Sequence, residues 1–229
     1  MKSVFRWVSK GYGPIRAARN LAAAVIFAAS PALAAPVTLL ALGDSLTQGY
    51  GLAAPEDGLV PQLQAWLRAQ GADVTVINAG VSGDTTAGGR ARLDWSLTPD
   101  VDAVMIALGG NDLLRGLPPA EARANLEAML ATVQARGLPV LLAGLPAPGN
   151  YGAEYQAEFD AIWPDLAKKY DAVLVPNLLG PIAALSLEDR IGANLMQDDN
   201  IHPSPAGVTL VVAALGPKVL ALLAKITTH

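Results

Sequence analysis

A serine near the start of the chain and a histidine near its end have the side chains needed for acyl transfer. Ser45 follows Gly43 and Asp44, and His202 closes the segment Asp199-Asn200-Ile201-His202. The sequence contains 2 histidines, and the other one, His229, is its last residue. A serine hydroxyl becomes nucleophilic when a neighbouring base accepts its proton, and an unperturbed imidazole, with a pKa of about 6.5, suits that role. The base for Ser45 is therefore predicted to be His202.

A carboxylate is predicted to complete this pair. Asp199 precedes His202 by three residues, so a turn in the intervening chain would bring its carboxylate to the imidazole Nδ1. Pro203 limits how that turn can vary. At Nδ1 the carboxylate would fix the tautomer of the ring and stabilise the imidazolium that forms. Neighbouring Asp198 is the alternative for this role.

The oxyanion that forms during attack on an acyl group needs hydrogen-bond donors. The candidates are the backbone N–H groups of Ser45 and Gly83 and the side-chain amide of Asn111. Each donor of this kind is typically worth a factor of about 10² to 10³ in rate. Taken alone, Asn111 could instead cap a helix.

The polar residues beside these candidates are interpreted as structural. Asp44 and Asp112 flank Ser45 and Asn111 and are predicted to organise their loops by binding the backbone. Asp84 and Thr85 suit the start of a helix. Gly43, taken alone, is most simply a turn residue after a strand.

Short apolar runs alternate with longer segments that have apolar residues at helical spacing. The runs are rich in Val, Ile and Leu and are predicted to be buried strands, at residues 37–42, 74–78, 101–108, 140–144 and 172–175. The helical segments cover residues 59–69, 120–135, 155–170 and 205–226. This alternation predicts a single α/β domain, in which right-handed crossovers place helices on both faces of a parallel sheet.

The candidate residues follow the ends of the predicted strands. Ser45 follows the first strand, residues 78–83 follow the second, and Asn111 follows the third. His202 lies in the loop before the last helix. Ligands of open α/β sheets bind outside the carboxyl ends of the strands. The sequence therefore predicts one site at this edge of the sheet.

Residues 1–34 are predicted to be a secretory signal that is cleaved at or near Ala34. The segment holds five basic residues and no acidic one, an apolar stretch at residues 21–29, and the small-x-small pattern Ala32-Leu33-Ala34. The apolar stretch is shorter than the roughly 20 residues that span a bilayer, so no stable membrane span is expected. An uncleaved anchor or amphipathic helix is the alternative. Residues 35–229 would form the mature domain, in the periplasm or outside the cell.

Charge and cysteine content restrict the class of function. Residues 1–34 hold five of the 16 basic residues and none of the 20 acidic ones, so their removal changes the formal net charge from −4 to −9. An acidic chain disfavours nucleic acid as a partner, because phosphates are bound by Lys and Arg. The chain has 0 cysteines, which excludes disulfides, thiolate ligands and a thiol nucleophile. We expect a reaction without metal or cofactor.

Four segments together resemble the conserved blocks of the SGNH (GDSL) hydrolases. They are GDSLT at 43–47, NAGVSGDTTAGG at 78–89, GGND at 109–112 and DDNIHP at 198–203. Their spacing is most similar to the branch of small bacterial thioesterase, lysophospholipase and arylesterase enzymes. The likeness extends over nearly all of residues 35–229, and four blocks in the same order make it specific.

The resemblance implies a flavodoxin-like three-layer α/β/α sandwich with a five-stranded parallel sheet. It also implies a nucleophile, an acid–base pair and oxyanion partners at positions that agree with the prediction from the residues: Ser45, Asp199, His202, Gly83 and Asn111. The segment is not the Gly-x-Ser-x-Gly elbow of α/β-hydrolases, because position 47 is Thr47.

In enzymes of this family, the segment after the Asn111 block helps to bind the acyl chain. The resemblance therefore implies that Leu113, Leu114 and Leu117 contact substrate. Ordinary packing at the start of a helix is the alternative for these leucines.

We expect an exported serine hydrolase that cleaves small acyl esters, thioesters or lysolipids through an acyl-Ser45 intermediate. One alternative is a carbohydrate O-deacetylase with the same chemistry, although the aromatic content of 5% is low for a sugar site. Another is a non-catalytic lipid-binding protein on the same fold. Acyl-chain length, leaving group and oligomeric state are left open by the sequence.

Overall fold

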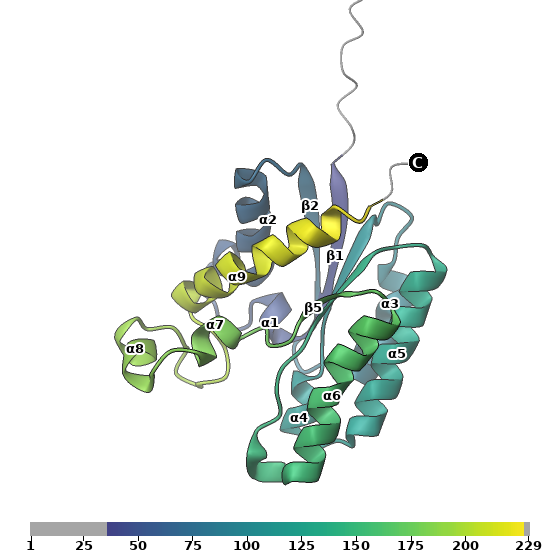
Figure 1. The fold of residues 1–229 in the computed structure, drawn as a ribbon. Helices are drawn as coiled ribbons and strands as arrows, with labels where there is room; N and C mark the ends of the chain where they lie inside the picture. Colours follow the sequence, from purple (N-terminus) through teal and green to yellow (C-terminus); the bar gives the residue numbers. More distant parts are fainter. Residues whose placement is uncertain (1–35, 227–229) are drawn as a thin grey trace, which may run out of the picture. The chain divides into compact units, whose positions relative to one another are not determined.

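A parallel sheet lies at the centre of the computed structural model, which describes residues 36–226 (Figure 1). Its strands are β1 (Val37–Gly43), β2 (Val74–Gly80), β3 (Ala103–Ala107), β4 (Val140–Ala143) and β5 (Val173–Val175). Every neighbouring pair is parallel, and the spatial order is β2-β1-β3-β4-β5. This is the flavodoxin-like order, so the predicted fold class is confirmed.

Helices cover both faces of this sheet and make three layers (Figure 1). One face is covered by α2 (Leu59–Ala69) and α9 (Pro205–Leu223). The other is covered by α3 (Thr86–Ser96), α5 (Pro119–Ala135) and α6 (Ala153–Lys169). Short helices fill the connections: α1 (Ser45–Gln48), η1 (Pro55–Asp57), α4 (Gly110–Leu114), η2 (Gly149–Tyr151), α7 (Gly180–Ala183) and α8 (Leu187–Gly192).

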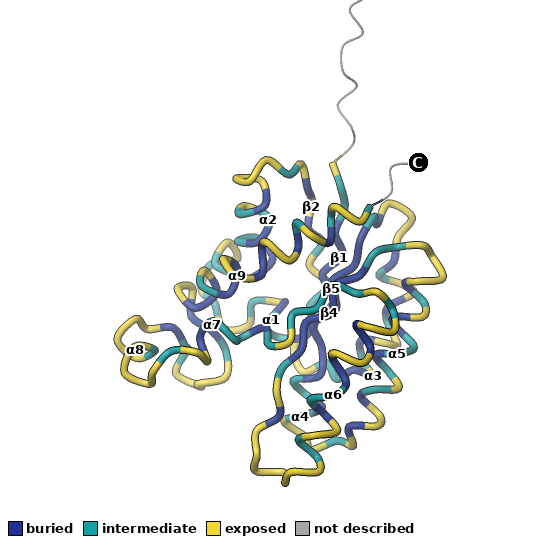
Figure 2. Tube along the Cα trace, viewed as in Figure 1, coloured by how far each residue is buried: buried dark blue, intermediate teal, exposed yellow. Residues whose placement is uncertain are grey.

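The apolar strand residues divide between two hydrophobic clusters according to the two-residue period of a strand. In β1, Leu39 and Ala41 belong to the cluster under α2 and α9, whereas Leu40 and Leu42 belong to the cluster under α3, α5 and α6. All four side chains are fully buried. In Figure 2 buried residues (dark blue) are concentrated in the central strands, and exposed residues (yellow) lie along the surrounding helices and loops. Burial on both faces explains why β1, β3 and β4 are rich in apolar residues.

Every strand differs from its predicted bounds by one or two residues at one or both ends, and two of these differences have a structural counterpart. β3 begins at Ala103 rather than residue 101, because the Asp102 carboxylate accepts a hydrogen bond from the Thr38 N–H at 2.7 Å, in the loop that leads into the strand. β2 continues to Gly80, so Asn78 lies within the strand and not after it. A Cβ at Gly80 would overlap the backbone of Gln48, so glycine permits the close approach of β2 to α1. The predicted long helices end within three residues of the observed ends.

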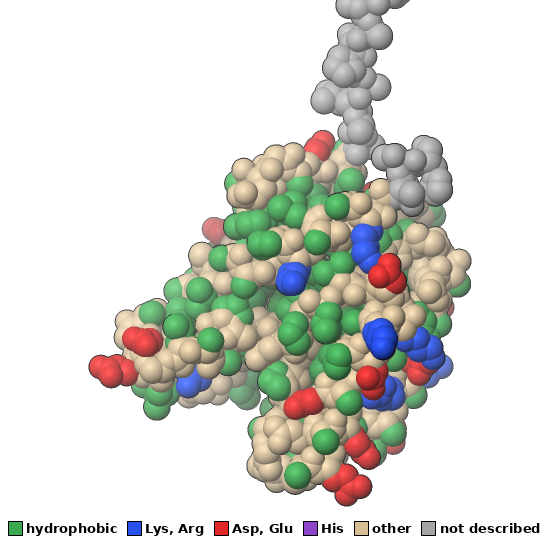
Figure 3. All heavy atoms as spheres, in the orientation of Figure 1, with side chains coloured by type: hydrophobic (Ala, Val, Ile, Leu, Met, Phe, Trp, Pro, Cys, Tyr) green, Lys and Arg blue, Asp and Glu red, His purple; other side chains and the backbone are tan. Residues whose placement is uncertain are grey.

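By length and composition alone, α9 is long and apolar enough to cross a membrane. Apolar side chains (green) are numerous over it in the space-filling view (Figure 3). Its inner residues, including Val211, Val212 and Leu215, are nevertheless buried in the cluster shared with α2 and the sheet. A Cβ at Gly216 would overlap the Trp66 ring of α2, which shows how closely the two helices pack. In this fold α9 is a core helix.

The predicted signal, residues 1–34, lies outside the described residues, and its cleavage stays a prediction.

On the face drawn in Figure 3, acidic side chains (red) gather at the tip of α8 and at the lower end of α6.

Candidate active site

Ser45 stands at the point where β1 turns into α1. Asp44 caps this helix, and its Oδ1 accepts a hydrogen bond from the Leu46 N–H at 3.1 Å. The cap fixes the first turn, so the half-buried Ser45 side chain has a defined direction at the carboxyl edge of the sheet. β1 and β3 are the strands at which the strand order reverses, and such switch points are where ligands bind in this fold.

Ser45, His202 and Asp199 are joined by consecutive hydrogen bonds. The distance from His202 Nε2 to Ser45 Oγ is 2.8 Å, and the distance from His202 Nδ1 to Asp199 Oδ2 is 2.6 Å. The imidazole is largely shielded, with 13% of its side-chain surface exposed, whereas Asp199 is 37% exposed. His202 can therefore accept the Ser45 proton while Asp199 holds the opposite nitrogen.

The loop from Met196 to Pro203 presents both members of the acid–base pair. A β-bridge joins its two ends, and the Gln197 N–H donates to the His202 carbonyl at 2.8 Å. Inside the loop, Asn200 has a φ of +55°, and this left-handed residue makes the turn tight. The turn brings Asp199 back onto the residue three positions later, as the sequence predicts.

Hydrogen bonding keeps Asp199 ionised. Its carboxylate accepts hydrogen bonds from the backbone N–H of His202, from the His202 ring and from the backbone N–H of Ile201. These hydrogen bonds lower the pKa of Asp199 to about 2. Among residues 36–226, none donates a hydrogen bond to the Asp198 carboxylate, and its backbone carbonyl accepts one from the Asn200 side chain at 3.3 Å. The geometry thus selects Asp199 over Asp198 as the partner of the imidazole.

Gly83 lies on the loop that follows β2, and Asn111 lies in the first turn of α4, after β3. Gly83 has a φ of +83°, and within the described residues neither its N–H nor that of Ser45 donates a hydrogen bond. The Asn111 amide donates to the Asp84 carbonyl at 3.0 Å and lies 3.4 Å from Asp44 Oδ2. The structure therefore brings Asn111 to the Ser45 turn rather than using it to cap α4. Its role as an oxyanion donor stays a prediction.

Asp44 and Asp112 are both buried beside the site. Asp112 accepts hydrogen bonds from the N–H and hydroxyl of Thr86, at 2.8 and 2.6 Å, and so ties α4 to the start of α3. Burial raises the pKa of Asp44 to about 6, against the opposing hydrogen bond from Leu46 and the charge of His202. Both aspartates organise the loops, as expected from the sequence.

The chain was compared with known proteins by sequence and by structure. A model of the GDSL-like lipase/acylhydrolase family matches residues 41–210. The chain belongs to this family. The predicted resemblance is confirmed, and this acylhydrolase carries its nucleophile candidate, Ser45, at the fold's ligand-binding edge.

Individual relatives extend over most of this acylhydrolase. It is 39% identical over 191 residues to "Esterase TesA" of Pseudomonas aeruginosa, covering 83% of this chain and 91% of the relative. It is 37% identical over 172 residues to "Thioesterase 1/protease 1/lysophospholipase L1" of Escherichia coli, covering 75% and 77%. The crystal structure of AlinE4, an SGNH-hydrolase family esterase, matches with a TM-score of 0.65 and 46% identity, covering 82% and 97%.

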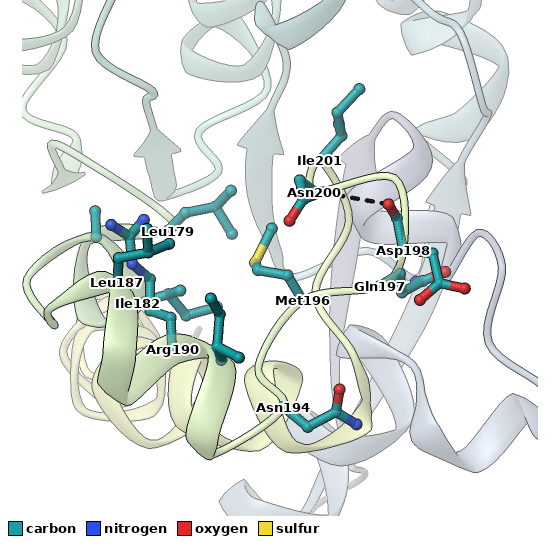
Figure 4. Close-up of a pocket in the computed structure, with 12 residues that line it drawn as sticks. Leu179, Ile182, Leu187, Arg190, Asn194, Met196, Gln197, Asp198, Asn200 and Ile201 are labelled. Atoms are coloured by element: carbon teal, nitrogen blue, oxygen red, sulfur yellow. Dashed lines mark hydrogen bonds between the residues drawn. The ribbon is translucent and has the colours of Figure 1, made fainter.

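A cavity of about 630 Å³ adjoins the His202 loop of this acylhydrolase (Figure 4). One wall comes from α7 and α8 and the other from the loop that carries Asp199 and His202. The wall is mainly apolar, with one cation, one carboxylate and three amides: Leu179, Ile182, Ala183, Leu187, Arg190, Ile191, Asn194, Met196, Gln197, Asp198, Asn200 and Ile201. This volume falls within the range of small-molecule sites.

The predicted substrate leucines do not line this cavity. Leu113 packs against the core cluster beneath α5 and α6, and Leu114 is 59% exposed on α4. Leu117 is half-buried after α4, and its carbonyl accepts a hydrogen bond from the Tyr155 hydroxyl at 2.9 Å. Leu113 is partly buried and packs as its alternative describes, and substrate contact by Leu113, Leu114 and Leu117 stays a prediction.

Several site residues were not predicted from the sequence. The ring of Tyr50 lies 4.9 Å from the His202 ring, and Gln197 binds the Tyr50 carbonyl at 2.9 Å. Arg115 donates to the Gly83 carbonyl at 2.7 Å, and Arg92 binds three groups behind Ser45. Tyr50 and Arg115 lie within five residues of the GDSLT and GGND segments, and this closeness in sequence could have indicated them as site residues. In the described residues, no cluster of His, Asp or Glu is arranged to hold a metal ion.

Proposed function

We propose that this acylhydrolase is an exported serine esterase that cleaves acyl esters or thioesters through a covalent acyl-Ser45 intermediate. The observation that carries the proposal is a pair of hydrogen bonds made by His202. One joins its Nε2 to Ser45 Oγ at 2.8 Å, and the other joins its Nδ1 to Asp199 Oδ2 at 2.6 Å. A contact between nucleophile and base, with the base held by a third group, is the geometric requirement of this chemistry.

In the first half-reaction, Ser45 Oγ bonds to the acyl carbon while its proton passes to His202 Nε2. The carbonyl π electrons move onto oxygen, and the oxyanion accepts hydrogen bonds from the N–H groups of Ser45 and Gly83 and from the Asn111 amide. The intermediate then collapses, and the bond from carbon to the leaving oxygen or sulfur breaks. His202 gives its proton to the leaving alcohol or thiol.

In the second half-reaction, water attacks the acyl-Ser45 ester as His202 accepts one of its protons. Collapse of the second oxyanion breaks the bond to Ser45 Oγ, which takes the proton back from His202. The carboxylic acid is released and the resting contacts form again. Throughout, the charged Asp199 stabilises the imidazolium, consistent with its pKa of about 2.

The cavity beside the His202 loop supports an acyl chain as part of the substrate. Its apolar side chains include Leu187 and Ile191, which are 65% and 70% exposed, and such a surface gains from covering by a hydrocarbon chain. None of the described residues that line it is aromatic, which disfavours the carbohydrate O-deacetylase alternative. The names of the relatives, esterase and thioesterase/lysophospholipase, support ester, thioester and lysolipid substrates.

Replacement of Ser45 by Ala tests the proposal. We expect the S45A variant to lose hydrolysis of p-nitrophenyl esters and labelling by a fluorophosphonate, with an unchanged circular dichroism spectrum. Ser96→Ala is the matched control, because the Ser96 hydroxyl only binds a carbonyl of its own helix at 2.9 Å. Esterase activity in S45A above a few per cent of wild type would refute the assignment.

Export is tested separately with the full chain. The basic, apolar and small-x-small pattern of residues 1–34 supports a cleaved signal. We expect a bacterium that expresses the chain to place it in the periplasm or medium, with a mature mass that corresponds to cleavage near Ala34. A cytoplasmic protein of full-length mass would refute export without affecting the esterase assignment.

A further inference from the structure

We propose that Arg92 and Asp84 form a positioning pair that sets the geometry of the oxyanion hole. The inference rests on the proposed function and concerns the same site. Neither residue belongs to the acid–base line of Ser45, His202 and Asp199. Their effect on the reaction would be exerted through Gly83 and Asn111.

Arg92, on α3, binds three separate segments behind the nucleophile. Its Nη2 donates to the Gly43 carbonyl at 2.8 Å, its Nη1 to the Ala79 carbonyl at 2.7 Å, and its Nε to Asp84 Oδ2 at 2.6 Å. One planar guanidinium thus joins the end of β1, the end of β2 and the loop before α3. Because the donors of arginine form a rigid fork, these three contacts fix the relative position of the segments.

Asp84 contacts the segments that carry the two predicted oxyanion donors outside α1, the Gly83 N–H and the Asn111 amide. It directly follows Gly83, and its N–H donates to the Val81 carbonyl at 3.1 Å, which closes the turn that presents the Gly83 N–H. Its own carbonyl accepts the Asn111 amide at 3.0 Å. The ion pair at Asp84 therefore holds donors that come from two different strand ends.

Local sequence leaves the Asp84 carboxylate available for Arg92. Thr85, not Asp84, caps α3, and its hydroxyl accepts the Gly88 N–H at 3.3 Å. A Cβ on Gly88 would lie 2.6 Å from Asp84 Oδ1, so the carboxylate occupies space that only glycine leaves open. The two side chains of the pair are each 20% exposed, and partial burial strengthens their interaction relative to a surface ion pair.

An oxyanion hole acts by having its donors in place before charge develops. A displacement of about 1 Å can cost a factor of about 10² in rate. Loss of an interaction made only with the oxyanion lowers kcat and leaves substrate binding nearly unchanged. A defect in the Arg92–Asp84 pair should therefore appear in kcat and not in KM.

The kinetic test uses Arg92→Lys and Arg92→Gln with p-nitrophenyl butyrate, normalised to the fraction of Ser45 labelled by a fluorophosphonate. We expect kcat to fall by a factor of about 10 to 10² in R92Q and by less in R92K, with KM within a factor of about two. Binding of an alkyl trifluoromethyl ketone, whose adduct with Ser45 carries the oxyanion, should weaken by the same factor as kcat.

Arg136→Gln is the matched control. Arg136 also binds a carbonyl and a carboxylate, those of Leu97 and Asp94, at 2.7 and 2.9 Å, but at the other end of α3. We expect R136Q to change thermal stability while its kcat and ketone affinity stay at wild-type values. A kcat loss in R136Q equal to that in R92Q would refute a specific role for Arg92.

A second variant tests the pair without removing Arg92. Gly88→Ala should displace the Asp84 carboxylate and lower kcat in the same way. In a double-mutant cycle, adding R92Q to N111A should cost less than R92Q costs alone, because N111A already removes one of the two donors that Arg92 positions through Asp84. Fully additive losses, or wild-type kcat in both R92Q and G88A, would refute the positioning pair and leave the esterase assignment intact. A wild-type protein with no esterase activity would refute both.

Discussion

Asp199 binds His202 with both oxygens of one carboxylate. Oδ1 accepts the backbone N–H of His202 at 3.0 Å, and Oδ2 lies 2.6 Å from its Nδ1. Through this carboxylate the orientation of the imidazole is tied to its own backbone. This relationship determines what a substitution at Asp199 should do.

Asp199→Asn should impair the base while keeping the loop. The asparagine Oδ1 can still accept the backbone N–H groups of Ile201 and His202, but its amide would present a donor to Nδ1 and favour the wrong tautomer. We expect kcat for p-nitrophenyl esters to fall by a factor of about 10² to 10⁴. Steady-state kinetics give the measurement, with thermal unfolding to verify the fold. A loss below fivefold would show that the imidazole is oriented without Asp199.

Asp44 should make the protein less stable as pH rises. Its pKa is about 3.8 in an unfolded chain and about 6 in the folded protein, so between these pH values the folded state binds more protons. The free energy of unfolding should then decrease by up to about 3 kcal/mol from pH 4 to pH 7 through this group alone. We expect Asp44→Asn to remove this decrease, as measured by urea unfolding at several pH values. Parallel pH profiles for wild type and D44N would contradict it.

We expect acyl-chain length to be selected in the cavity that adjoins the loop carrying His202. Ile191→Trp would fill part of the cavity from an exposed position, so we expect kcat/KM for dodecanoyl esters to fall at least tenfold relative to butanoyl esters. Leu114→Trp, on α4, is the comparison, because that residue lies outside the cavity. The measurement is a chain-length series of p-nitrophenyl esters. A larger change in L114W than in I191W would move the acyl site to α4.

α9 should be sensitive to added volume on its inner face. Gly216→Ala places a methyl group against the Trp66 ring, and overpacking of this kind costs about 1 to 3 kcal/mol. Ala213→Ser, on the exposed side of the same helix, is the control and should change the free energy of unfolding by less than about 0.5 kcal/mol. Chemical denaturation measures both. Equal effects would show that α9 does not pack against α2 as described.

The long elements of the fold could be predicted because their patterns are local. β3 and β4 are apolar runs buried throughout, and the helices at residues 59–69 and 205–223 have the expected spacing. The short helices gave no signal, since the four residues of α7 and six of α8 are too few to show a period. The cavity that these helices form was missed for that reason.

The site could be predicted only where its chemistry lies in short motifs. Ser45, Asn111, Asp199 and His202 combine reactive side chains with turn residues, and the structure brings them together. Arg92 gave no comparable signal. Its partners come from three segments that only the folded sheet makes adjacent, and a guanidinium on a helix usually faces solvent.

The closed loop from Met196 to Pro203 has a consequence for how such enzymes diverge. Asp199 and His202 occupy one short, closed stretch of chain. A substitution elsewhere in the chain therefore leaves the contact between them in place. The wall that faces this stretch across the cavity, on α7 and α8, belongs to different residues. Substitutions on α7 and α8 can therefore change the range of substrates, while Asp199 and His202, which do not line the cavity, keep their contacts.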